Sequence, residues 1–183
     1  MEFVSAGTLF DDPQTGERSE VLASPTETGD RYRVRLTLPP GSTGPERHRH
    51  PALTEEFVVR SGTVSFRLGR EISVLRAGET RRAASGTTHA LWNSGDGPAE
   101  IDVEIIFAPP GPRPAADIVQ FGALYAEIAR AGHRPGLLVT ALLLDDFSDA
   151  YALAVPLALQ RAIVRPLAAI ARMHGRENAN RTG

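Results

Sequence analysis

The sequence predicts a mainly β domain followed by an α-helical extension, and three observations lead to that prediction. Up to residue 110, short runs of alternating polar and apolar residues are separated by turns rich in glycine and proline. After residue 114, apolar residues instead recur every three or four positions, as they do in helices. The proline-rich link PPGPRP (109–114) separates the two patterns. We therefore expect a β domain over residues 1–110 and a helical extension over 111–183 that packs on it.

The clearest strand candidate is RYRVRLTL (31–38), in which apolar side chains alternate with arginine or threonine. The segment EFVVRSGTVSFRLG (56–69) is expected to form two strands joined at Ser61 and Gly62. The other strand candidates are residues 71–79, 88–93 and 99–109. Many short strands with regularly spaced turns are typical of a sandwich or a barrel.

Three helices are expected in the extension, over residues 115–132, 136–147 and 156–173. Pro156 suits the first turn of the last helix. Pro166 is expected to kink or divide that helix, and the final residues are expected to fray.

One stripe of the last helix is polar, beside a broad apolar remainder, and consists of Gln160, Arg161, Arg165 and Arg172. Helices with this pattern can cover the outer sheet of a barrel, which is the interpretation we prefer. The same pattern also fits a dimer contact or a helix lying at a membrane surface.

Composition excludes several classes of protein. The formal net charge of −2 gives no attraction to nucleic acid, and no basic recognition helix is evident. The absence of cysteine excludes disulfides, thiolate metal sites and a cysteine nucleophile. The N-terminus does not resemble a secretory signal, and charged residues and prolines interrupt the most apolar stretch, 136–173. We expect a cytoplasmic protein without stable membrane insertion.

Histidines point to chemistry in the β domain. His48 and His50 are two residues apart, so that on a strand both would face the same side. Glu55 and Glu56 follow shortly after, and His89 begins a later strand candidate. If these strands share one barrel wall, three imidazoles and a carboxylate can converge, a donor set that suits a divalent first-row metal. The first segment alone would equally fit a charged, solvent-exposed turn.

Two motifs that contain these histidines resemble the signatures of the cupin superfamily. Residues 48–62, HRHPALTEEFVVRSG, resemble the first signature, in which HxH is followed by three or four residues, Glu, six residues and Gly. Residues 78–93, GETRRAASGTTHALWN, resemble the second, with Ala84 in place of the family's proline. The glycine expected ahead of the first histidine is also out of register. The resemblance covers about residues 30–109 and implies a double-stranded β-helix, the cupin or jelly-roll barrel.

Carried over position by position, the resemblance implies four metal ligands: His48, His50, Glu55 and His89. They would hold one divalent transition metal per chain, iron, manganese, nickel or zinc. The six residues before Gly62 select Glu55 over Glu56, which strand alternation would then turn outward. The glycines and Asn93 match framework positions. His133 and His174 lie in the helical part and are expected at helix ends or on the surface.

The resemblance further implies a metal-dependent enzyme that acts on a small organic molecule. An oxygenase, acting for example on a secondary metabolite, is the first expectation. A redox-neutral isomerase or lyase and a non-catalytic binding protein are the alternatives. Glu55, or hydroxide on the metal, would act as the base. Phe57, Val59 and Leu91 would line the substrate pocket, although a role in the apolar core is about equally compatible. Cupins commonly pair through their sheets, so a homodimer is expected.

Overall fold

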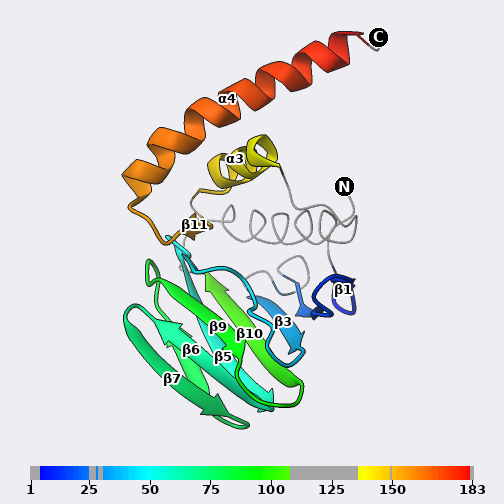
Figure 1. Ribbon diagram of the computed structural model, residues 1–183, viewed down its shortest axis with the longest axis vertical. Helices are drawn as coiled ribbons and strands as arrows, with labels where there is room; N and C mark the ends of the chain where they lie inside the picture. The colour runs from blue at the N-terminus through cyan, green and yellow to red at the C-terminus, as the bar shows by residue number, and fades with distance from the viewer. Residues whose placement is uncertain (1–4, 25–27, 29–30, 108–135, 149, 182–183) are drawn as a thin grey trace.

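Two antiparallel β-sheets face each other, and two helices lie beyond one end of them (Figure 1). The computed structural model describes residues 5–24, 28, 31–107, 136–148 and 150–181. The mainly β fold with C-terminal helices that the sequence predicts is confirmed. The expected helix at 115–132 and the domain boundary at residue 110 lie outside the described residues.

The first sheet has six strands in the order β1-β2-β3-β10-β5-β8. Their bounds are β1 Leu9–Asp11, β2 Arg18–Ala23, β3 Arg31–Leu38, β10 Ala99–Phe107, β5 Leu53–Ser61 and β8 Thr80–Ala83. The second sheet has five strands in the order β11-β4-β9-β6-β7. Their bounds are β11 Ala152–Leu153, β4 His48–Arg49, β9 His89–Asn93, β6 Thr63–Leu68 and β7 Glu71–Arg76.

Strands with strong alternation form where the sequence predicts them. The segment 31–38 is β3, and 56–69 splits into β5 and β6 on either side of Gly62. Gly62 has a φ of 79°, a conformation that favours glycine because it lacks a Cβ. The strand expected over 71–79 is shorter: β7 ends at Arg76, and the chain turns at Gly78 before β8 begins. The short strands β1, β4 and β11 carry too few residues for a period to be recognised.

The main hydrophobic core is formed by buried side chains of both sheets. Along β5, side chains at alternate positions are buried, so Leu53, Glu55, Phe57 and Val59 all face inward. The rings of Phe57 and Phe66 meet across the two sheets with centroids 4.7 Å apart. Glu55 is therefore held in a row of apolar side chains, where a carboxylate needs a specific partner.

The two helices form a second, smaller hydrophobic cluster with each other. They are α3 (Leu137–Asp146) and α4 (Leu157–Arg181). Ala141 and Leu144 of α3 pack near Val164 and Ala168 of α4. At the edge of this contact, Arg172 binds Asp145 at 2.8 Å and Asp146 at 2.6 Å.

The course of α4 differs from three expectations. The helix is not divided at Pro166 and continues to Arg181, beyond the expected fraying point. Pro166 lies on the exposed side of α4, where water can bind the carbonyl that loses its donor. Gln160 does not belong to a solvent-facing polar stripe: it is buried, with 3% of its surface exposed. Its side-chain oxygen accepts a hydrogen bond from the backbone of Leu153, which explains its burial.

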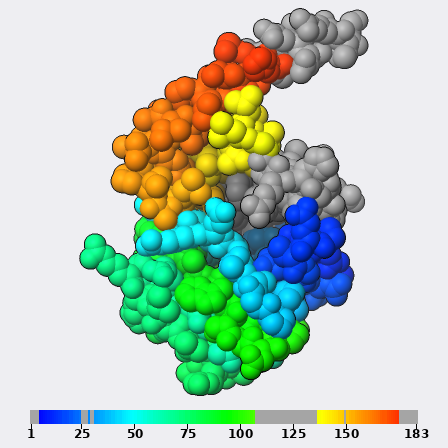
Figure 2. Space-filling model, viewed as in Figure 1, coloured from blue at the N-terminus to red at the C-terminus, as the bar shows by residue number. Residues whose placement is uncertain are grey.

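The two described helices, α3 and α4, lie at the end of the barrel and do not cover an outer sheet face (Figure 1). In Figure 2 the orange and red surface of α4 lies above the barrel. The chain segment between α3 and α4 provides the link, because β11 pairs there with β4. Among the described helices, none is both long and apolar enough to cross a membrane.

Candidate metal centre

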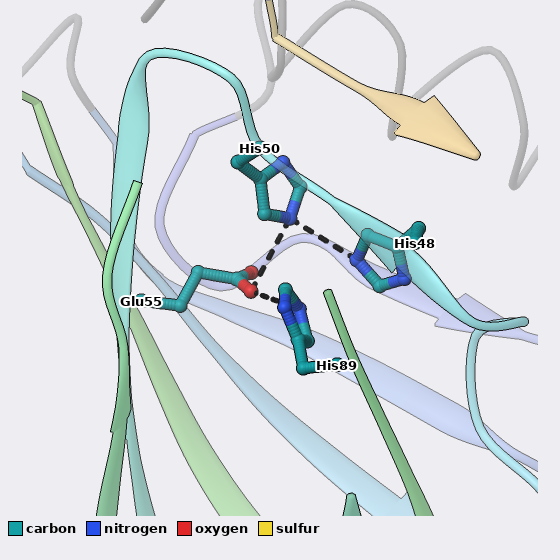
Figure 3. A group of neighbouring side chains, drawn as sticks. All are labelled: His48, His50, Glu55 and His89. Atoms are coloured by element: carbon teal, nitrogen blue, oxygen red, sulfur yellow. Dashed lines mark hydrogen bonds and ion pairs between the residues drawn. The ribbon is translucent and has the colours of Figure 1, made fainter. Parts of the chain in front are cut away.

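The structure brings together the four residues that the two motifs single out. His48 lies on β4 directly opposite His89 on β9, and His50 follows the end of β4. Glu55 comes from β5 in the other sheet. Their potential ligand atoms all lie within 4.8 Å of one another (Figure 3). The centre thus lies between the sheets and needs both of them.

The four side chains point at a common centre. Nε2 of His48 is 3.1 Å from Nε2 of His50. Oε2 of Glu55 is 3.2 Å from Nε2 of His50 and 2.6 Å from Nε2 of His89 (Figure 3). All four residues are buried, with at most 6% of their surface exposed. Three imidazole nitrogens and a carboxylate oxygen therefore converge in a place from which bulk water is largely excluded.

Backbone carbonyls hold the outer nitrogen of each ring. Nδ1 of His48 lies 2.6 Å from the carbonyl of Glu46, and Nδ1 of His89 lies 3.0 Å from that of Thr87. Nδ1 of His50 lies 2.6 Å from the carbonyl of Ala150. A carbonyl can only accept, so the ring proton belongs on Nδ1 in each case. The Nε2 lone pairs then face inward, as metal ligation by histidine requires.

Burial and mutual charge shift the pKa values of these groups. Burial, followed by the nearby rings of His89 and His50, lowers the pKa of His48 to about 3. Burial would raise the pKa of Glu55, but the neighbouring rings of His50 and His89 outweigh burial and hold that pKa well below its usual range. Burial would lower the pKa of His50, yet Glu55 and the carbonyl of Ala150 raise it overall. The carboxylate is thus ionised and His48 is neutral at neutral pH, the forms that bind a cation, whereas a metal would have to displace a proton that the raised pKa favours on His50.

The donor atoms fit a bound cation. Oε2 of Glu55 and Nε2 of His89 are buried without a hydrogen-bond partner, although they lie only 2.6 Å apart. With a proton of His89 on Nδ1, its Nε2 is the ring atom that can bind a metal together with Oε2 of Glu55. Buried polar atoms without partners cost free energy, and a divalent ion between them would remove that cost. The site is able to hold a metal with nitrogen and carboxylate ligands.

The neighbouring carboxylate points the other way. Glu56 alternates with Glu55 along β5, and its side chain is 43% exposed. It lies 3.4 Å from Arg82 on the adjacent strand β8, on the outer surface. The outward orientation expected of Glu56 agrees with this geometry.

The expected pocket residues lie in the core. Phe57, Val59 and Leu91 are 3%, 1% and 4% exposed and belong to the main hydrophobic cluster. Of these three residues, Phe57 packs its ring against a residue of the centre: its centroid lies 5.7 Å from that of His89. Their contribution to the core is evident, and their expected role in binding a substrate stays a prediction.

Two groups near the centre were not expected from the sequence. The carbonyl of Ala150 orients His50, and the ring of Tyr151 stacks on His48 with centroids 4.7 Å apart and planes 17° apart. Neither belongs to the cupin motifs, and a backbone carbonyl has no signature in a sequence. Of the two histidines expected elsewhere, His174 is exposed on α4 and His133 lies outside the described residues.

Asn93 has the framework role expected of it. The side-chain amide of Asn93 donates to the carbonyls of Leu38, at 2.8 Å, and Gly97, at 2.9 Å. Its oxygen accepts from the backbone of Gly95 at 2.9 Å. Asn93 therefore ties the end of β9 to the neighbouring turn and lies in the same strand as His89.

The fold and the site together define a class of protein. Residues 34–106 match the family model described as a cupin domain. The chain therefore carries a domain of the cupin superfamily.

Known proteins are similar to part of this chain. The xanthan biosynthesis protein XanB of Xanthomonas campestris pv. campestris is 35% identical over 77 residues, which is 41% of this chain but only 16% of that protein. The crystal structure of a predicted oxalate decarboxylase from Thermotoga maritima covers 59% of this chain and 100% of its own, with a TM-score of 0.50 and 22% identity. The structure of KdgF from Halomonas sp. covers 59% of this chain and 94% of its own, with a TM-score of 0.47 and 20% identity. The Thermotoga structure confirms the double-stranded β-helix fold.

Proposed function

We propose that this chain is a metal-dependent enzyme of the cupin type that acts on a small organic molecule. One observation carries the proposal: the unpartnered Nε2 of His89 and Oε2 of Glu55, buried 2.6 Å apart, lie where a cation would bind. His48, His50, Glu55 and His89 would be its ligands.

A divalent ion bound there would supply Lewis acidity and, if it is iron, the capacity to activate dioxygen. One anionic ligand on a dication leaves a net charge near +1, which favours substrates that chelate through an enolate, a carboxylate or vicinal oxygens. Phe57 packs against His89 on the core side and keeps that ring shielded from water. Glu55 is the one carboxylate of the cluster and so the candidate proton acceptor.

Within this class we propose an oxygenase. The support is the resemblance to the dioxygenase members of the superfamily that keep three histidines and one glutamate. The redox-neutral alternative, an isomerase or lyase, is supported by the 35% identity to a protein whose name places it in xanthan biosynthesis. The metal discriminates between them, because dioxygen chemistry needs a redox-active ion and zinc is not one.

Metal analysis tests the proposal first. Protein purified without added metal is analysed by mass spectrometry, and we expect about one transition-metal ion per chain. Absence of bound metal, even after incubation with iron(II), manganese(II), nickel(II) and zinc(II), would overturn the proposal. His89→Ala, prepared in the same way, controls for adventitious binding.

Oxygen consumption then tests the reaction class. The iron(II) protein is mixed with α-keto acids, β-diketones and catechols in an oxygen electrode. Uptake that depends on substrate and is lost in His89→Ala supports the oxygenase. Turnover without oxygen uptake by the manganese or zinc protein supports an isomerase or lyase instead.

We also propose, from the cupin resemblance, that the chain pairs into a homodimer. Light scattering of the eluted protein should give about twice the chain mass of 19.7 kDa. A mass of one chain at micromolar concentration would contradict this. The cytoplasmic location of the protein stays a prediction from the sequence.

A further inference from the structure

We infer that the segment between α3 and α4 forms one wall of the metal centre and positions two of its histidines. Residues 150–155, called the strap here, include β11. In the strap, the carbonyl of Ala150 orients His50 and the ring of Tyr151 holds His48. This inference rests on the proposed metal centre. It adds groups from the helical extension that the cupin motifs do not contain.

His50 differs from the other two histidines in the carbonyl that holds its ring. His48 and His89 each place Nδ1 on the carbonyl two residues earlier in the chain, a contact within the segment just ahead of each strand. His50 instead uses a carbonyl 100 residues away, at 2.6 Å. Ala150 is 1% exposed, so that water does not compete for the bond. The orientation of His50 therefore depends on the strap being in place.

Tyr151 of the strap packs against both His48 and His50. Its ring stacks on His48 at 4.7 Å and meets His50 edge to face, with centroids 5.9 Å apart and planes at 69°. One aromatic ring therefore contacts both imidazoles and restricts rotation of each. Holding ligands in one rotamer lowers the entropy lost when a metal binds.

The strap is bound on both of its sides. Toward the barrel, Ala152 and Leu153 pair with Arg49 and His48 of β4, and the guanidinium of Arg49 donates to the carbonyl of Val155 at 2.5 Å. Toward the helices, the backbone N–H of Leu153 donates to Gln160 at 2.9 Å. Such a doubly anchored segment links the helical extension to the centre. By linkage, if the strap strengthens metal binding, metal binding strengthens the attachment of the strap equally.

Variants of Tyr151 test the inference. Zinc affinity is measured by competition with a chromophoric chelator at fixed pH. Tyr151→Leu removes the aromatic contact and should weaken zinc binding about 10- to 100-fold, the effect typical of groups that orient a ligand. Tyr151→Phe keeps the ring and should restore binding.

Leu167→Ala is the matched control. Leu167 packs in the same helical cluster as Tyr151 but comes from α4. It should lower stability and leave zinc affinity unchanged. Equal affinities of Tyr151→Leu and wild type would overturn the inference, as would an equal loss in Leu167→Ala. Wild type that binds no zinc would instead overturn the proposed metal centre.

Hydrogen exchange of the unaltered protein provides a measurement that does not depend on a variant folding. Amides of the strap should exchange more slowly with zinc bound than without it. Amides of β7, at the opposite edge of the same sheet, are the internal control and should change less. Zinc binding without slower exchange in the strap would overturn the inference.

Discussion

Nε2 of His89 lies 2.6 Å from Oε2 of Glu55, and the two atoms come from opposite sheets of the barrel. Both are buried without a hydrogen-bond partner. Folding thus holds two candidate ligand atoms side by side in the interior, where a divalent ion could bind both. The variants below measure how far metal binding depends on each of these residues.

His89→Ala should lose most of its bound metal, because one of the nitrogen ligands is removed from the centre. The affinity should fall by at least the 10- to 100-fold typical of losing an outer-shell partner. His174→Ala is the control, since His174 lies exposed on α4 and outside the cluster. Metal content of both variants is measured by mass spectrometry. Retention of metal by His89→Ala would remove His89 from the ligand set.

Glu55→Gln should also lose metal, since it replaces the one anionic ligand with a neutral amide. Glu56→Gln should keep it, because Glu56 points outward toward Arg82. The exposed pair between Glu56 and Arg82 contributes about 0–1 kcal/mol, so that Glu56→Gln should fold with nearly normal stability. The reverse pattern, an empty site in Glu56→Gln and a full one in Glu55→Gln, would show that the assignment is wrong.

Asp102 should contribute to acid stability. It is 3% exposed on β10, and its carboxylate accepts hydrogen bonds from Arg35 at 2.7 and 3.1 Å and from Arg60 at 2.7 Å. Burial would raise the pKa of Asp102, but these two arginines outweigh it and lower that pKa. A lowered pKa in the folded state means that the stabilisation is complete above the unfolded value of about 3.9 and is lost as pH falls through the folded one.

Asp102→Asn should therefore reduce the free energy of unfolding at pH 7 by about 1–3 kcal/mol. It should also flatten the loss of stability below about pH 4. Urea unfolding at several pH values measures both effects. Asp96→Asn, in an exposed turn, is the control and should change neither. A parallel fall of the wild type and Asp102→Asn between pH 5 and 2 would be inconsistent with the assigned role.

Two glycines with similar backbone angles should differ in their tolerance of alanine. Gly62 has a φ of 79° and Gly78 a φ of 88°. A Cβ on Gly62 would lie 2.7 Å from the carbonyl oxygen of Pro98, whereas a Cβ on Gly78 would meet nothing within 4 Å. Gly78→Ala should cost about 1–2 kcal/mol for the left-handed backbone. Gly62→Ala should cost clearly more, because the backbone must also move. Thermal unfolding compares the two, and equal costs would contradict this explanation.

Much of the barrel is predictable because its side chains alternate. The pattern of 31–38 places β3, and Gly62 places the turn between β5 and β6. Alternation likewise turns Glu55 inward and Glu56 outward. These features depend only on nearby residues in the sequence, because successive side chains of a strand alternate between its two faces.

The course of α4 is less predictable. The expected polar stripe contains Gln160, which is buried because the backbone N–H of Leu153 needs an acceptor there. Pro166 does not divide the helix. It lies on the exposed side of α4, where water can bind the backbone carbonyl that would otherwise accept from an N–H at position 166. In both cases a contact with another segment, or with solvent, overrides the local preference.

By itself the sequence separated a β part from a helical part through the spacing of its apolar residues, and its resemblance to the cupin signatures implied the four residues of the candidate centre. Only the tertiary structure decided how those residues are held. The unpartnered pair of His89 and Glu55 exists because two sheets face each other. The contacts of Ala150 and Tyr151 with His50 and His48 exist because β11 pairs with β4 across about 100 residues of chain. A backbone carbonyl and an aromatic ring acquire such a role only through their position, which long-range pairing sets.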